Sequence, residues 1–215
     1  MQISKKYLLI SLISSIALSL LPEFVGSAYG AFNEIMMSIG IIGMIVSSLF
    51  LIIILYKQLS AKKVIEKAVA KDAAWDENGL KVFARGVFYK IQYALDNGDY
   101  TALKDLVTPE VQEFLEREIE KRSRSLQTSK VRSIDIRDTN IISSRDHIDD
   151  DKDTYSVYIT GLLENYDKTG REGITTTEFG EIYCFGRVGE NWILKKIMLN
   201  PSLMHLLLTS SKSEV

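Results

Sequence analysis

The 215-residue chain is 46% hydrophobic and 25% charged, with a formal net charge of −2. Beyond residue 78 it carries 19 basic and 22 acidic side chains, a net charge of −3, whereas the first 78 residues carry seven and six, a net charge of +1. Contacts to phosphates need a basic face, so this balance argues against a nucleic-acid partner. The chain from Gly79 onwards has the usual length of one domain with one core.

An uncharged run of 22 residues extends from Ile35 to Tyr56. An α-helix needs about 20 apolar residues to cross a bilayer, so the run predicts a transmembrane helix. Lys5 and Lys6 precede an earlier apolar stretch, and more lysines follow Tyr56. Because Lys-rich segments stay on the cytoplasmic side, we expect an inner (cytoplasmic) membrane protein whose C-terminal domain is cytoplasmic. The lone Cys184 agrees, since it cannot form an internal disulfide.

The earlier apolar stretch, Tyr7 to Pro22, leaves two interpretations open. Its 16 uncharged residues include four serines, which is short for a span and typical of the apolar region of a signal peptide. Ala28-Tyr29-Gly30 offers small residues for cleavage before Ala31. Residues 1–30 are therefore either a signal peptide or a first transmembrane helix, and the chain is single- or double-pass.

Residues 57–78 have the composition of a basic juxtamembrane helix. One interpretation is an amphipathic helix on anionic headgroups, where each nearby lysine adds about 1 kcal/mol. The other is a solvated linker helix whose lysines only set the topology. The candidate residues for the membrane surface are Lys57, Lys62, Lys63, Lys67 and Lys71.

Three helices are predicted before any strand of the soluble part. The first presents one apolar stripe at three- and four-residue steps, and Asn97-Gly98-Asp99 ends it. A short helix is expected from Tyr100 to Val107. Thr108-Pro109-Glu110 begins the third, with Thr at the cap, Pro in the first turn and Glu at the positive end of the dipole. The stripe of the first helix consists of Leu80, Phe83, Val87, Phe88, Ile91, Ala94 and Leu95.

After Lys130 the apolar period changes from 3.6 to 2, which predicts strands. We expect one or two strands over residues 131–142, and further strands from Tyr155 to Tyr166, Thr175 to Val188 and Trp192 to Leu199. The connections are too short for parallel crossovers. Helices followed by hairpins predict an α+β fold, with about three helices packed on the concave face of a curved antiparallel sheet. The domain would cover residues 79–199, followed by a tail at 200–215.

The catalytic inventory is thin. The chain contains no phosphate loop, Rossmann glycine pattern, nucleophile elbow or zinc-protease motif. His147 lies in an acidic turn at 143–153 that lacks the glycine and glutamate of a calcium loop, which favours a solvated turn over a cation site. His205 is more typical of a short docking helix than of a base, and Cys184 of a buried strand residue than of a nucleophile. We expect no catalytic residue, metal or cofactor.

The strand at 179–187 has an amphipathic pattern of its own. Alternation places its aromatic and charged side chains on one face. Glu181 and Arg187 are about 20 Å apart along the strand, so each needs another partner or water. The row is either ordinary sheet packing with two charges at the rim or a pocket with aromatic walls and polar ends. Its members are Phe179, Glu181, Tyr183, Phe185 and Arg187.

Two segments carry recognisable motifs. The first extends over Phe88 to Ala94 with Gly98-Asp99, and then over Leu106 to Glu110. The second is Glu181-x-Tyr183-x-Phe185-x-Arg187, followed by Trp192-x-Leu194-x-x-Ile197. They resemble the opening and the ending of the Tim44-like domain family, and the resemblance covers roughly residues 75–199. One departure is Tyr183, where the family usually carries Trp.

The resemblance implies a cone-shaped fold similar to that of nuclear transport factor two, with helices closing over a curved sheet to leave a cavity. Mitochondrial relatives are peripheral inner-membrane proteins that tether a chaperone or the mitoribosome, and the eukaryotic domain is associated with anionic lipid. No catalytic residues belong to the family motif. The residues expected to line the cavity are Phe88, Ile91, Tyr158, Phe179, Tyr183, Phe185 and Trp192.

The leading hypothesis is a non-enzymatic scaffold, anchored in the membrane, that holds a protein partner or anionic lipid headgroups at the cytoplasmic face. One alternative is carriage of a small hydrophobic ligand or lipid in the cavity. Another is an isomerase or dehydratase of the same fold, which would need an acid inside the cavity. Candidates for that acid are Asp99, Tyr158 and Glu181.

Overall fold

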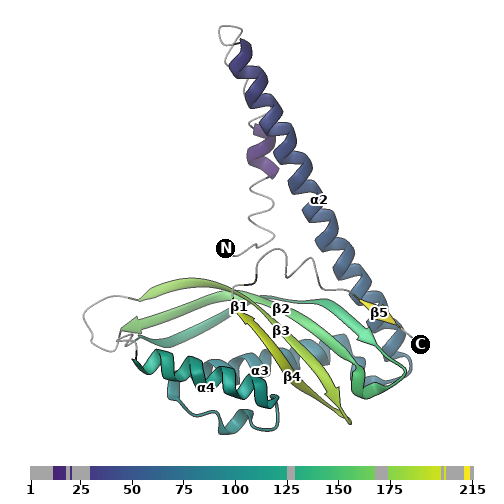
Figure 1. Ribbon diagram of the computed structural model, residues 1–215, viewed down its shortest axis with the longest axis vertical. Coiled ribbons are helices and arrows are strands. Elements are labelled where there is room, and N and C mark those ends of the chain that lie inside the picture. Colours follow the sequence, from purple (N-terminus) through teal and green to yellow (C-terminus); the bar gives the residue numbers. More distant parts are fainter. Residues whose placement is uncertain are drawn as a thin grey trace. The chain divides into compact units, whose positions relative to one another are not determined.

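The computed structural model describes residues 12–17, 20, 30–124, 129–167, 174–199, 201 and 211–213 (Figure 1). The chain divides into two compact units, one formed mainly by Ile3–Tyr56 and the other mainly by Lys57–Val215. The second unit contains the helices and the sheet of the predicted domain.

Helix α2 (Gly30–Val69) is continuous over 40 residues. It includes the predicted span 35–56 and continues past it, because no proline interrupts the helix where the sequence changes from apolar to basic. Among the described residues, its Met37–Val69 segment is the one helix that is long and apolar enough to cross a membrane, with a hydropathy of 2.7 in its most apolar stretch. Large side chains such as Ile42 and Ile52 are 61% exposed, as on a helix that meets lipid.

The first apolar stretch lies largely outside the described residues. Residues 12–17 are helical, while most of Tyr7 to Pro22 and Ala28-Tyr29 are not described. A signal peptide and a first transmembrane helix therefore both stay open. His205 and the rest of 202–210 in the predicted tail also lie outside the described residues.

The last turns of α2 belong to the domain core. Ala61, Val64, Ile65 and Ala68 are all buried, with at most 7% of their surface exposed. Ser144 donates its hydroxyl to the carbonyl oxygen of Ala61 at 2.9 Å. Residues 57–78 thus do not form the separate helix expected from their composition. They are the end of α2, a turn, the 3₁₀ helix η2 (Ala73–Trp75) and the start of the next helix.

Helices α3 (Glu77–Asn97) and α4 (Pro109–Arg124) lie where the sequence predicts them, and α4 begins at Pro109, directly after Thr108. The expected side-chain cap is not formed, because Thr108 Oγ1 makes no hydrogen bond. The Asp76 carboxylate caps α3 by accepting from the backbone N–H of Gly79 at 2.7 Å. Gly98 ends it with φ of 70°, in the left-handed region that favours glycine. The helix expected at 100–107 is shorter, a single 3₁₀ turn η3 (Thr101–Leu103).

The sheet confirms the predicted α+β class. In the described residues its strands are β1 (Ser129–Asp146), β2 (Thr154–Asp167), β3 (Thr175–Val188), β4 (Asn191–Leu199) and β5 (Lys212–Ser213), in the order β4-β3-β2-β1-β5. The strands β1 to β4 form an antiparallel meander, and the short β5 runs parallel to β1. Register shifts along β1 mark bulges, which bend a strand and suit the predicted curved sheet.

Helices α3 and α4 cover one face of the sheet (Figure 1). Phe88 of α3 stacks on Phe179 of β3 with ring centroids 5.0 Å apart. Tyr155 of β2 stacks on Phe185 of β3 at 4.8 Å in the same core. The other face of the sheet carries a smaller cluster around Ile182, so β3 alternates as the sequence predicts.

Candidate functional site

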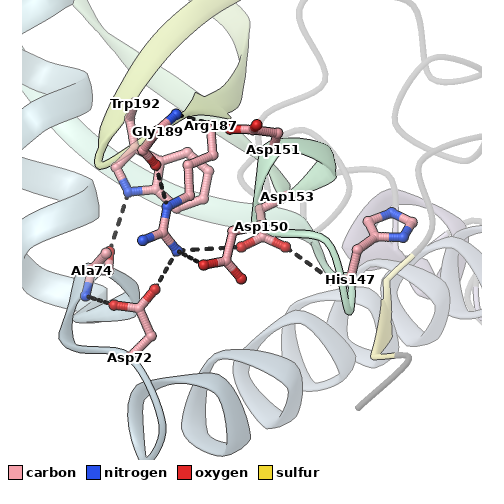
Figure 2. Close-up of polar contacts among 9 residues, drawn as sticks. All are labelled: Asp72, Ala74, His147, Asp150, Asp151, Asp153, Arg187, Gly189 and Trp192. Carbon is pink, nitrogen blue, oxygen red and sulfur yellow. Dashed lines mark hydrogen bonds and ion pairs between the residues drawn. The ribbon is translucent and has the colours of Figure 1, made fainter.

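Arg187, near the end of β3, is surrounded by acidic side chains from separate parts of the chain (Figure 2). Its side chain is only 8% exposed. Nη1 forms an ion pair with Asp72, and lies 3.5 Å from Asp153 Oδ2 and 3.8 Å from Asp150 Oδ2. Nε donates to the carbonyl oxygen of Gly189 at 2.9 Å. Arg187 thus has partners other than Glu181, as expected from the distance between the two residues along the strand.

Asp153 is the most deeply buried of these acids. Its Oδ1 accepts the backbone N–H of His147 at 2.8 Å, while Oδ2 has no hydrogen bond and relies on the nearby guanidinium. Burial raises the pKa of Asp153, and the charges of Asp146 and Asp150 raise it further, whereas the backbone N–H of His147 and, to a smaller extent, Arg187 lower it. The ionised form of Asp153 is therefore compensated by the His147 N–H on Oδ1 and by the Arg187 guanidinium near Oδ2.

The segment after α2 is fastened to the ends of β3 and β4. Asp72 Oδ1 accepts the N–H of Ala74 at 2.9 Å, and this bond, together with Arg187, keeps the pKa of Asp72 below its ordinary value. Trp192 Nε1 donates to the carbonyl oxygen of Ala74 at 3.2 Å. The ring of Trp75 meets that of Trp192 edge-on at 5.1 Å. One arginine and two tryptophans thus join this segment to the sheet.

The aspartates between β1 and β2 form contacts within the domain that the sequence did not indicate. Asp150 and Asp153 surround Arg187, and Asp151 accepts the N–H of Gly189 at 2.8 Å. Within the part of the chain that the structure describes, no group of three or more His, Cys, Asp and Glu side chains could hold a metal ion.

A small pocket of about 60 Å³ lies between α3, α4 and the helix-covered face of the sheet. Its polar end is formed by Glu181, which is 9% exposed and accepts the hydroxyl of Tyr183 at 2.5 Å. Burial raises the pKa of Glu181, although Tyr183 and Arg122 oppose the effect. Gln92 is 4% exposed, and its Oε1 has no hydrogen-bond partner. The lining residues are Ile91, Gln92, Leu95, Phe114, Leu115, Glu118, Arg122, Leu163, Glu181, Tyr183, Ile197 and Leu199.

The pocket contains two of the residues expected to line a cavity, Ile91 and Tyr183. The others expected there do not line it. Phe88, Phe179, Phe185 and Trp192 pack against one another and their neighbours in the core, and Tyr158 lies with the cluster on the opposite face of the sheet. The rings of the four core residues occupy space between the helices and the sheet.

The acidic residues considered for an enzyme, Glu181, Asp99 and Tyr158, do not lie together in the pocket. Glu181 lines the pocket, whereas Asp99 is exposed and accepts the N–H of Thr101 at 3.0 Å. Gln92 and Arg122 were not predicted. A signal for Gln92 was available, because it is a polar residue beside Ile91 on the predicted apolar side of a helix.

Most of the predicted membrane-surface lysines are exposed, while most of the apolar side of their helix is buried. Lys62, Lys63, Lys67 and Lys71 are exposed, and Lys57 is half-buried. Ala61, Ile65 and Ala68 are packed in the domain core, whereas Leu59 and Val69 are exposed. The buried residues are therefore not available for insertion among headgroups.

A sequence model of the Tim44-like domain matches residues 61–197, from the last turns of α2 to β4. A solved structure, the intermembrane space region of the chloroplast protein ARC6, is similar with a TM-score of 0.40 and 8% identity, over 57% of this chain and 97% of that chain. No curated protein sequence matches the chain. The matched region covers more than half of the chain, begins where α2 enters the core and ends within β4. The chain therefore belongs to the Tim44-like domain family.

Proposed function

We propose that this chain is a membrane-anchored scaffold that holds a protein partner at the cytoplasmic face of the inner membrane. The proposal rests on the observation that one continuous helix, α2, contains both a candidate membrane span and part of the domain core. Its Met37–Val69 segment has the length and hydropathy of a span, and residues 61–68 of the same helix contribute to the domain core. Membership of the Tim44-like family supports a membrane-associated binding role.

A protein partner is favoured over lipid headgroups. A spanning helix attaches a protein to a membrane almost irreversibly, so the domain needs no lipid affinity of its own. Ala61, Ile65 and Ala68 pack in the core, which leaves the lysines and two separate apolar side chains, Leu59 and Val69, to meet headgroups. Such lysines are already explained by the bias of basic residues toward the cytoplasmic side.

Carriage of a hydrophobic ligand is disfavoured by the size of the pocket. Ligand sites occupy roughly 300–1,000 Å³, against about 60 Å³ here. A space of this size holds a few water molecules or the end of a side chain. Phe88, Phe179, Phe185 and Trp192, which were expected to line a larger cavity, pack in the core instead.

The pocket supports the enzyme alternative in one respect. Glu181 is a buried carboxyl whose pKa burial raises, as in known general acids. The same small volume leaves little room for a substrate beside it. We therefore favour binding over chemistry.

The experiment is affinity capture with the tagged, detergent-solubilised full chain. The matched control carries the same tag on residues 1–56, which keep the apolar part of α2 and lack the domain. We expect at least one protein to be enriched by the full chain and absent from the control. Equal enrichment in both samples would contradict partner tethering, and release of the chain from membranes by alkaline extraction would contradict the anchor.

A further inference from the structure

An exposed apolar row runs along α3 on the side away from the core. Val82 is 66% exposed, Tyr89 45% and Tyr93 61%. Together with Gly86 they follow steps of four, three and four residues, which is the spacing of the seam between packed helices. We call Val82, Gly86, Tyr89 and Tyr93 the α3 seam. It extends for about 16 Å, three turns of the helix.

Gly86 is unexplained by the fold itself. It lies in the middle of α3 and is exposed, and a methyl group added to it would meet no atom within 4 Å. Glycine in a helix interior is destabilising relative to alanine, so its presence here brings the domain no benefit. It does leave a notch between Val82 and Tyr89, into which the backbone of a second helix could approach closely.

The charged side chains that α3 carries between Glu77 and Asp96 are all basic. Arg85 and Lys90 are exposed and occupy the two flanking positions that select partners in paired helices. Arg85 is held in place because its Nε donates to Thr139 Oγ1 of β1 at 2.8 Å. No acidic residue occurs between Glu77 and Asp96. A helix that covers the seam would therefore match it best with acidic residues at its own flanks.

We propose that the α3 seam is the docking surface for an amphipathic helix of the partner protein, with an apolar row flanked by glutamate or aspartate. The inference rests on the proposed function and names the chemistry of the partner. A second copy of this chain fits less well, because two such seams would bring Arg85 and Lys90 against like charges. A helical partner is favoured over a bilayer because a missing side chain at Gly86 allows close approach of another helix backbone, whereas contact with lipid does not require it.

The test uses the detergent-solubilised full chain and two synthetic peptides of about three heptads with the same leucine seam. One peptide carries glutamate at its flanking positions and the other lysine. Fluorescence anisotropy of the labelled peptides should give a Kd at least about tenfold lower for the glutamate peptide. Equal affinities would overturn the proposal.

Variants locate the binding to the α3 seam. Lys90→Glu should reduce the preference for the glutamate peptide about tenfold, while Lys196→Glu, at an exposed lysine of β4, should leave it unchanged. Gly86→Gln fills the notch with a good helix former and should weaken binding about tenfold while the domain stays folded. Unchanged binding in Lys90→Glu and Gly86→Gln would overturn the proposal.

Two further measurements separate the other occupants. Sedimentation that shows self-association abolished by Gly86→Gln would assign the seam to a second copy. A Tyr89→Cys, Cys184→Ser chain should react equally fast with a water-soluble maleimide in detergent and in anionic phospholipid vesicles, and slower reaction in vesicles would assign the seam to the bilayer. Either result would overturn the proposal. Capture of the same proteins by the wild type and by Gly86→Gln would contradict the role of the α3 seam alone. Capture of no protein by the wild type would contradict the proposed scaffold function itself.

Discussion

Replacement of Arg187 with methionine tests whether the acidic cluster stabilises the domain through this one cation. The change keeps most of the side-chain volume and removes the ion pair with Asp72, the approaches to Asp153 and Asp150, and the bond to Gly189. Removing one member of a buried ion pair costs about 3–5 kcal/mol. Asp72 and Asp150 are partly exposed and can be hydrated, so we expect the lower end, about 3 kcal/mol.

Thermal unfolding of the full chain, followed by circular dichroism, measures this loss. In a domain of this size each kcal/mol lowers Tm by about 2–4 °C, so Arg187→Met should unfold roughly 6–12 °C below the wild type. Burial already raises the pKa of Asp153, and loss of the guanidinium raises it further. The destabilisation should therefore be greatest above that raised pKa and decrease as the pH falls and Asp153 takes up a proton.

The second variant, Asp153→Asn, provides the control. In the Arg187→Met background it removes the buried carboxylate that has lost its cation, so it should restore a large part of the lost Tm. In the wild-type background the same change should have a much smaller effect or destabilise. A loss below about 1 kcal/mol for Arg187→Met, or no recovery in the double variant, would refute the role assigned to this cluster.

Three further substitutions test the core, the pocket and the exposed helix face. Phe88→Ala should cost about 3–5 kcal/mol in urea unfolding, while Tyr93→Ala, at a more exposed ring of the same helix, should change stability by about 0.5 kcal/mol or less. Equal losses would contradict the assignment of Phe88 to the core. Glu181→Gln should stabilise the chain at about pH 8 and not at about pH 4, because a carboxyl whose pKa is raised by folding destabilises the fold only when ionised, and a gain independent of pH would contradict this. Gly86→Ala should raise stability by about 0.5–1 kcal/mol, measured as a higher Tm, and a decrease would show that Gly86 is required by the fold.

The elements of the domain could be predicted because each has a local signal. The apolar stripe and the caps at Asp76 and Gly98 define α3, and alternation defines the strands. The end of α2 was harder, because the change from apolar to basic residues after Tyr56 suggests a boundary. The helical period continues across it through Ala61 and Ile65, and nothing in the local sequence says which surface those residues meet.

The candidate site was only partly predictable, because side-chain volume and long-range pairing decide it. Alternation correctly places Phe179 and Tyr183 on one face, but the pattern does not show that Phe88 stacks on Phe179 and occupies the expected cavity. Likewise, the segment 143–153 was predicted to be a solvated turn, whereas residues 143–146 belong to β1 and Asp153 lies beside Arg187 of β3. Such contacts depend on the register of the strands, which the composition of a turn does not contain.

In the proposed function, any pull from a bound partner would pass through the end of α2 and the segment that follows it. That segment is secured by the ion pair from Asp72 to Arg187 and by the contacts of Ala74 and Trp75 with Trp192, all of which lie at the ends of β3 and β4. Arg187→Met should therefore increase amide hydrogen exchange in residues 72–75 well before it affects α4. A uniform increase over the whole domain would mean that the cluster supports global stability and has no particular role in joining α2 to the sheet.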